Sequence, residues 1–107
     1  MGQIDNMKIL EKNNHYELEV YENAVFEDYE NILNYLMKEM SLKDVKEIDD
    51  FDSHYQLFSY NEYLIVLYYS NFLGISIYID DKNIDSDVQQ QVLNEFLEVL
   101  KKKSHKI

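Results

Sequence analysis

The chain has 107 residues, 46% of them hydrophobic and 14% aromatic, which predicts one folded domain over residues 1–107 and excludes a disordered segment. It has no cysteine, no signal-peptide pattern and no run approaching the ~20 apolar residues of a membrane span, so we expect a cytoplasmic protein without disulfides or membrane contacts. Its 21 acidic residues outweigh ten lysines, arginine is absent, and the net charge of −11 argues against direct binding of nucleic acid.

The first predicted element is a hairpin over residues 8–20. Its second half alternates Tyr16, Leu18 and Val20 with charged residues, and a polar Asn-Asn pair before it suits a tight turn. A helix follows, because apolar residues recur at three- and four-residue spacing from Phe26 to Met40. Acidic residues in its first turn suit the positive end of the helix dipole.

Residues 47–51 are predicted to form a short strand or an extended loop. Three strands are then expected over residues 54–60, 63–70 and 73–80. The middle one is apolar on both faces, which is typical of a central strand. In the last one, apolar residues alternate with smaller or polar ones, which predicts that one face is covered; the apolar set is Leu73, Ile75, Ile77 and Ile79.

A second helix is predicted after Asp80-Asp81-Lys82-Asn83, with Ser86 and Gln89 spaced as a capping box. The element order is two strands, a helix, three or four strands and a helix, written ββαβ(β)ββα. This order predicts an α+β fold, with an antiparallel sheet of about five strands and both helices packed on one face. Much of the other face is expected to be open.

Motifs for catalysis and cofactor binding are missing from the sequence. His15 and His54 have serines as candidate partners, but no serine sits in a nucleophile-elbow pattern, and no glycine-rich loop exists for phosphates. Asp49, Asp50 and Asp52 are candidate ligands of a divalent cation. Residues 81–92 follow an EF-hand loop at four positions, but Ser86 and Val92 stand where the glycine and the bidentate acid belong. We therefore expect no catalytic residue, cofactor or resident metal, with a metal-dependent enzyme using the three aspartates as an alternative.

The candidate binding site consists of acidic loops that lie next to strands carrying tyrosines. Tyrosine is enriched at interface hot spots, and carboxylates complement a basic partner. The sequence predicts that the tyrosines project from the open sheet face. The candidate partner-binding residues are Asp49, Asp50, Asp52, Tyr60, Tyr68, Tyr78, Asp80, Asp81 and Asp85. Ordinary sheet packing and a solvated acidic surface would account for the same residues without any function.

In its small size, acidity, lack of cysteine and α+β order, the whole chain resembles the immunity proteins of bacterial toxin systems such as contact-dependent growth inhibition. The resemblance implies a cytoplasmic inhibitor that binds and neutralises one toxin domain, often a nuclease. The alternative is a phage-type nucleic-acid mimic that acts on a host DNA-binding or defence protein. A homodimer through the exposed sheet face or a sheet edge is a further possibility.

Overall fold

The computed structural model describes residues 7–12, 15–21, 24–50, 52–81 and 83–105, with side chains described as far as Lys102. Over these residues the α+β prediction is confirmed. The elements are β1 (Lys8–Lys12), β2 (His15–Tyr21), α1 (Phe26–Glu39), β3 (Lys43–Asp49), β4 (Ser53–Tyr60), β5 (Tyr63–Ser70), β6 (Gly74–Ile79) and α2 (Ser86–His105). Neither described helix is long and apolar enough to cross a membrane.

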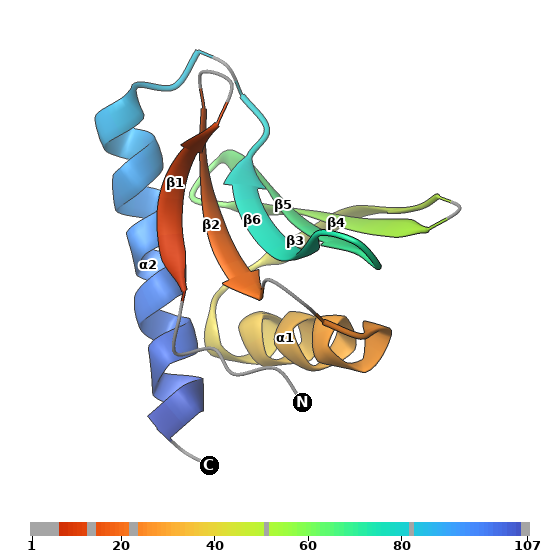
Figure 1. The fold of residues 1–107 in the computed structure, drawn as a ribbon. Helices are drawn as coiled ribbons and strands as arrows, with labels where there is room; N and C mark the ends of the chain where they lie inside the picture. The colour runs from red at the N-terminus through yellow and green to blue at the C-terminus, as the bar shows by residue number, and fades with distance from the viewer. Residues whose placement is uncertain (1–6, 13–14, 22–23, 51, 82, 106–107) are drawn as a thin grey trace.

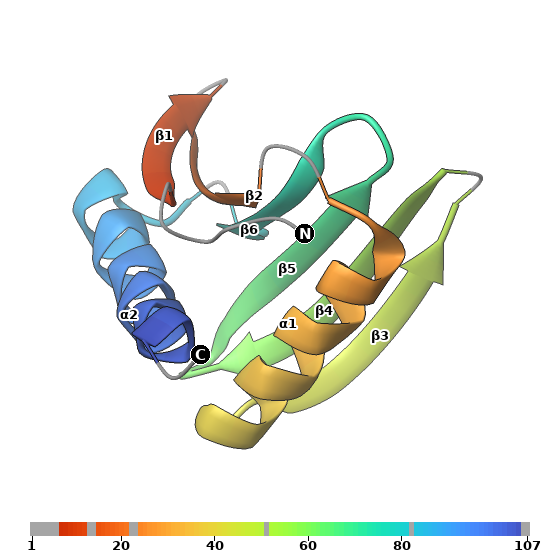
Figure 2. The ribbon, with the colours of Figure 1, turned by 60° about the horizontal axis from the view of Figure 1, so that its bottom comes forward.

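The six strands form one antiparallel sheet in the order β1-β2-β6-β5-β4-β3. The chain leaves β2 through α1, returns at the far edge as β3 and then steps back until β6 pairs with β2. Both helices lie on one face (Figures 1 and 2), where α2 packs against β1, β2 and β6, and α1 packs against β5. The opposite face is therefore left uncovered by the helices.

A single buried cluster fills the space between helices and sheet. Helix α1 contributes Tyr29, Ile32 and Leu36, which follow the spacing predicted for its apolar stripe. Where α2 meets the sheet, the ring of Phe96 stacks on Phe58 with 6.1 Å between centroids. This packing fixes which face of each strand is buried, because side chains alternate across a strand.

Strand β3 is longer than predicted and begins at Lys43 rather than at residue 47. All seven of its residues are exposed, and a bulge interrupts its pairing with β4 between Asp44 and Lys46. An exposed edge strand needs no alternation of apolar and polar residues, so the sequence pattern could not delimit it. The hairpin of β1 and β2 is confirmed, although the predicted turn at residues 13–14 lies outside the described residues.

The predicted capping box at the start of α2 is wrong. The side chain of Gln89 donates from Nε2 to the carbonyl of Ile84 at 2.8 Å and accepts at Oε1 from the backbone N–H of Tyr16 at 3.0 Å. The buried glutamine therefore ties the helix to β2. At the start of α1, by contrast, the Asp28 carboxylate accepts from the backbone N–H of Val25 at 3.1 Å, which satisfies one of the helix-terminal donors.

Candidate functional site

The open face of the sheet carries a row of polar and aromatic side chains from four neighbouring strands. Cross-strand register places Glu17 of β2 opposite Tyr78 of β6, and Tyr68 of β5 between Ser76 and Tyr55. These residues share a face because successive side chains in a strand point to opposite sides of the sheet. Helix-packed residues of the same strands, such as Leu18 and Ile77, point the other way.

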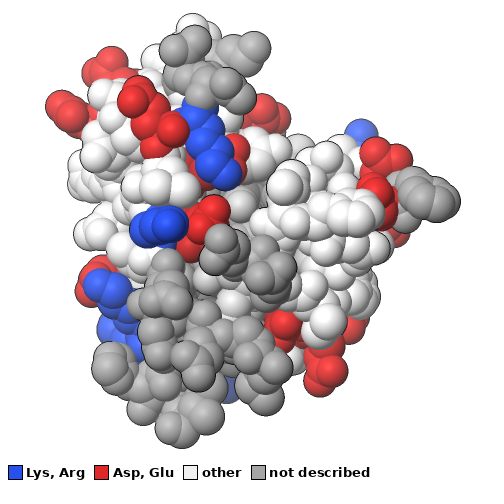
Figure 3. All heavy atoms as spheres, viewed as in Figure 1, with Lys and Arg blue, Asp and Glu red and all other residues white. Residues whose placement is uncertain are grey.

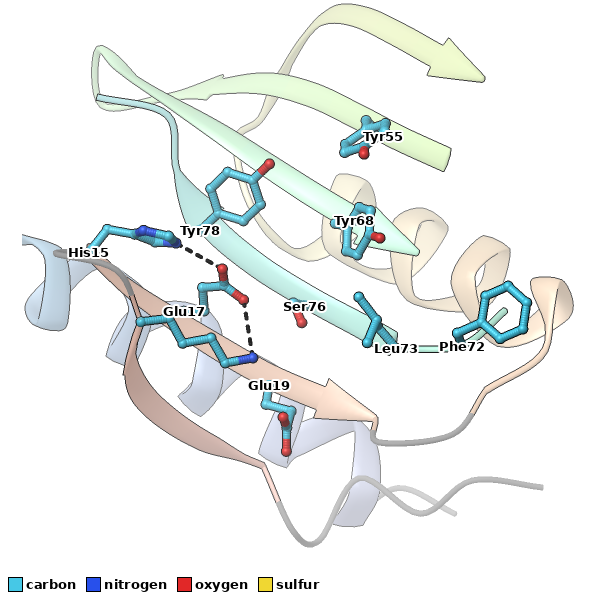
Figure 4. A pocket seen from close by; sticks show the side chains of 10 residues that line it. His15, Glu17, Glu19, Tyr55, Tyr68, Phe72, Leu73, Ser76 and Tyr78 are labelled. Atoms are coloured by element: carbon cyan, nitrogen blue, oxygen red, sulfur yellow. Dashed lines mark hydrogen bonds and ion pairs between the residues drawn. The ribbon is translucent and has the colours of Figure 1, made fainter. Parts of the chain in front are cut away.

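These side chains line a groove of about 540 Å³, called here the tyrosine groove. Figure 4 shows the rings of Tyr55, Tyr68 and Tyr78 standing above the sheet. The ring centroids of Tyr55 and Tyr68 are 4.9 Å apart. Among the described residues, the lining consists of Lys12, His15, Glu17, Glu19, Tyr55, Tyr68, Phe72, Leu73, Ser76 and Tyr78.

One wall of the groove is formed by β2 and β1 and carries paired charges. The Nε2 atom of His15 lies 2.8 Å from Oε2 of Glu17, and Nζ of Lys12 lies 3.7 Å from its Oε1. The Oε1 atom of Glu19 lies 4.0 Å from Nζ of Lys8. The imidazole of His15 also contacts the ring of Tyr78, with 5.7 Å between centroids. This wall therefore offers a carboxylate held in place next to an aromatic surface.

The β5–β6 turn closes one end of the groove with two large apolar side chains. Phe72 is 76% exposed and Leu73 is 64% exposed. Large apolar side chains are unusual in an exposed turn, where polar residues and glycine are preferred. The turn is fixed by a hydrogen bond from the N–H of Phe72 to Oγ of Ser70 and by a positive φ of 80° at Gly74. The prediction that Leu73 belongs to the covered face of a strand is wrong, because the strand starts at Gly74. The glycine that follows Phe72 and Leu73 was the sequence signal that these two residues belong to a turn and not to the strand.

The pKa values of two groove tyrosines, Tyr55 and Tyr78, are raised above their ordinary value of 10.0. Burial raises the pKa of Tyr78 to about 12, and the negative charges of Asp80 and Glu17 add to the effect. Burial also raises the pKa of Tyr55, with further contributions from neighbouring groups that include Asp50 and Asp52. At neutral pH these phenols are hydrogen-bond donors in a field made negative by carboxylates.

Of the three tyrosines predicted for the open face, Tyr68 and Tyr78 lie there and Tyr60 does not. The hydroxyl of Tyr60 donates to Oε1 of Glu95 on α2 at 2.5 Å, and its ring packs edge-on against Phe96. Tyr60 is two residues from the buried Phe58 and so shares its face. The alternation of β4 also places Tyr55 on the open face, which the prediction missed because inward-facing His54 and Gln56 obscure the pattern.

The predicted acidic clusters lie at opposite ends of the strands. Asp52 lies beside the β5–β6 turn, where its backbone carbonyl accepts a hydrogen bond from the N–H of Asn71 at 3.3 Å. Asp80 lies near the opposite end of β5, where its N–H donates to the carbonyl of Leu64. Figure 3 shows acidic side chains gathered near the tip of the β3–β4 hairpin and near the start of α2. The first cluster, between β3 and β4, contains Asp50 and Asp52. The second cluster, between β6 and α2, contains Asp80, Asp81 and Asp85. The charges of Asp50 and Asp52 act on Tyr55, and the charge of Asp80 acts on Tyr78, so both clusters contribute to the electric field in the tyrosine groove.

Asp49 is turned away from this face. Its Oδ1 atom lies 2.5 Å from Nδ1 of His54. The ring centroid of His54 is 4.6 Å from that of Phe26 and 5.9 Å from that of Tyr29, both on α1. The buried hydroxyl of Tyr29 has no hydrogen-bond partner among the described residues, and burial raises its pKa. The three neighbouring aspartates therefore do not converge on one point.

Within the described ranges, no group of three or more histidine, aspartate or glutamate side chains is arranged to hold a metal ion. In the EF-hand-like segment, Oδ1 of Asp81 accepts from the N–H of Asn83 at 2.9 Å, as in an ordinary turn between a strand and a helix. Comparison of the chain with models of protein families, with curated proteins and with solved structures finds no match. The chemistry of the groove itself is therefore the basis for a functional proposal.

Proposed function

We propose that the protein is an acidic protein-binding inhibitor, an immunity protein that neutralises a basic, nuclease-type toxin domain by covering it with the open sheet face. The observation that carries the proposal is the tyrosine groove. It combines three tyrosines, a carboxylate wall and two exposed apolar side chains at its end. On this proposal the protein acts by binding and not by catalysis.

The composition of the groove favours a protein partner. Tyrosine supplies a large amphipathic contact area, and interface hot spots are rich in aromatic residues. Phe72 and Leu73 would contribute apolar contacts that they lack in the isolated chain. A surface where apolar residues stand beside rims of charge is typical of protein recognition sites.

Charge favours a basic partner. The chain carries a net charge of −11, and acidic clusters lie beyond both ends of the groove. Such a field accelerates encounter with a positively charged surface. Carboxylates placed in a phosphate-binding cleft would occupy the lysine and arginine side chains that the toxin needs for nucleic acid. Inhibition would follow from this competition alone.

The experiment is co-purification from the host followed by an inhibition assay. Tagged wild-type protein should capture a basic protein, and one equivalent should block cleavage of nucleic acid by that protein. A Tyr68→Ser variant should lose both capture and inhibition. The matched control is Val25→Ser, which alters an exposed apolar residue at the start of α1 outside the groove.

Capture that survives Tyr68→Ser, or captured protein that keeps its full activity in the complex, would refute the proposal. The alternative, a phage-type nucleic-acid mimic, predicts binding to several unrelated DNA-binding proteins. A panel of such proteins should therefore be assayed in parallel. Tight binding to one partner only would favour the immunity protein, because specificity requires contacts that a general charge mimic does not make.

A further inference from the structure

We infer that the tyrosine groove receives an arginine side chain of the partner, held between the faces of its tyrosine rings and the carboxylate of Glu17. This inference rests on the proposed function and specifies its partner. The groove's volume of about 540 Å³ is more than one side chain needs, so the arginine would enter with part of its neighbouring backbone.

The rings supply the first element of recognition. Tyr55, Tyr68 and Tyr78 come from three adjacent strands, and their rings stand on the open face above the sheet (Figure 4). Aromatic faces carry negative electrostatic potential and attract cations within about 6 Å of the ring centroid. Because the rings belong to paired strands, they are held in position before the partner binds.

Glu17 supplies the second element. His15 engages Oε2 at 2.8 Å, whereas the contact of Oε1 with Lys12 is 3.7 Å long and lies at the exposed edge of the groove. This ion pair is weak, because the side chain of Lys12 is 43% exposed and remains hydrated. A guanidinium group can therefore replace Lys12 at Oε1 while His15 keeps the carboxylate oriented.

Arginine fits this arrangement better than lysine. A guanidinium is planar, is less strongly hydrated than an ammonium and stacks on aromatic rings while it donates hydrogen bonds in its plane. Its donors can reach Glu17 and phenol oxygens together. The exposed side chains of Phe72 and Leu73 at the end of the groove can cover the partner's adjoining apolar surface.

The test uses N-acetyl-arginine amide as the probe and N-acetyl-citrulline amide as its neutral, nearly isosteric control. Binding to the full chain is followed by NMR of the tyrosine ring protons at low ionic strength. We expect the arginine probe to shift Tyr68 and Tyr78 in a saturable manner, with an affinity at least about fivefold higher than that of the citrulline probe.

Glu17→Gln should weaken the arginine probe by a similar factor, while Glu30→Gln, the same change at an exposed position of α1, should not. Equal shifts with both probes, or no shift in the groove, would overturn the inference. So would binding that is unaffected by Glu17→Gln in a variant with an unchanged melting temperature. If these tests fail while capture of a partner still depends on Tyr68, the proposed function stands and only the arginine assignment falls.

Discussion

Gln89 on α2 and Tyr16 on β2 are 73 positions apart in sequence and are joined by a hydrogen bond of 3.0 Å from the backbone N–H of Tyr16 to the side-chain oxygen of Gln89. The other end of the same amide binds the carbonyl of Ile84. One buried side chain thus satisfies two backbone groups and sets the position of the helix on the sheet.

Replacing Gln89 by alanine should lower the free energy of unfolding by about 1–3 kcal/mol, because two backbone groups lose their partner. The neighbouring Gln90 is the matched control. It is exposed and makes only a 3.4 Å contact with Ser86, so Gln90→Ala should change stability by less than about 0.5 kcal/mol. Urea denaturation measures both. Equal effects of the two substitutions would show that the Gln89 amide does not tie α2 to β2.

Stability should fall as pH rises from 10 to about 12. Tyr78 ionises near its ordinary value of 10.0 in the unfolded chain and at about 12 in the folded one. In this interval the folded state binds more protons than the unfolded state, so its advantage decreases with increasing pH. Tyr78→Phe should make the decline shallower. Denaturation midpoints at several pH values, with tyrosinate absorbance as a second readout, test this, and parallel curves for the two proteins would contradict it.

Phe72→Ser should separate binding from folding. The side chain is 76% exposed, so stability should stay within about 0.5 kcal/mol of wild type. Affinity for the partner of the proposed function should decrease by about 2 kcal/mol, or roughly 30-fold, as for a hot-spot residue. Val25→Ser, at another exposed apolar position outside the groove, should leave affinity unchanged. Calorimetric titration gives the comparison, and unaltered affinity of Phe72→Ser would remove the turn from the interface.

Neutralising two aspartates of one hairpin should have unequal effects on association. Asp52 lies beside the β5–β6 turn at the groove, whereas Asp49 is paired with His54 on the helix side. Asp52→Asn should slow association with a basic partner roughly threefold at low salt, and Asp49→Asn should slow it less. Stopped-flow kinetics at several salt concentrations would measure this. A larger effect at Asp49 would place the interface on the other face of the sheet.

Much of the fold could be predicted from local patterns. Helix α1 was found through its three- and four-residue spacing, and the central position of β5 followed from an apolar run on both faces. Strand β3 was only partly found, since no residue in it is buried. Tyr60 was misplaced although its two-residue separation from Phe58 indicated the helix side.

The sequence by itself determined the negative charge, the absence of arginine and cysteine, and the order of every element except β3, which it left as a strand or a loop. Only the tertiary structure decided which residues meet, because the order of strands in a sheet depends on packing between distant segments. Pairing of β2 with β6 brings Glu17 opposite Tyr78, and pairing of β4 with β5 brings Tyr55 opposite Tyr68. The groove arises from these registers. The same registers turn Asp49 and Tyr60 to the other face, since a shift of one residue along a strand exchanges its two sides.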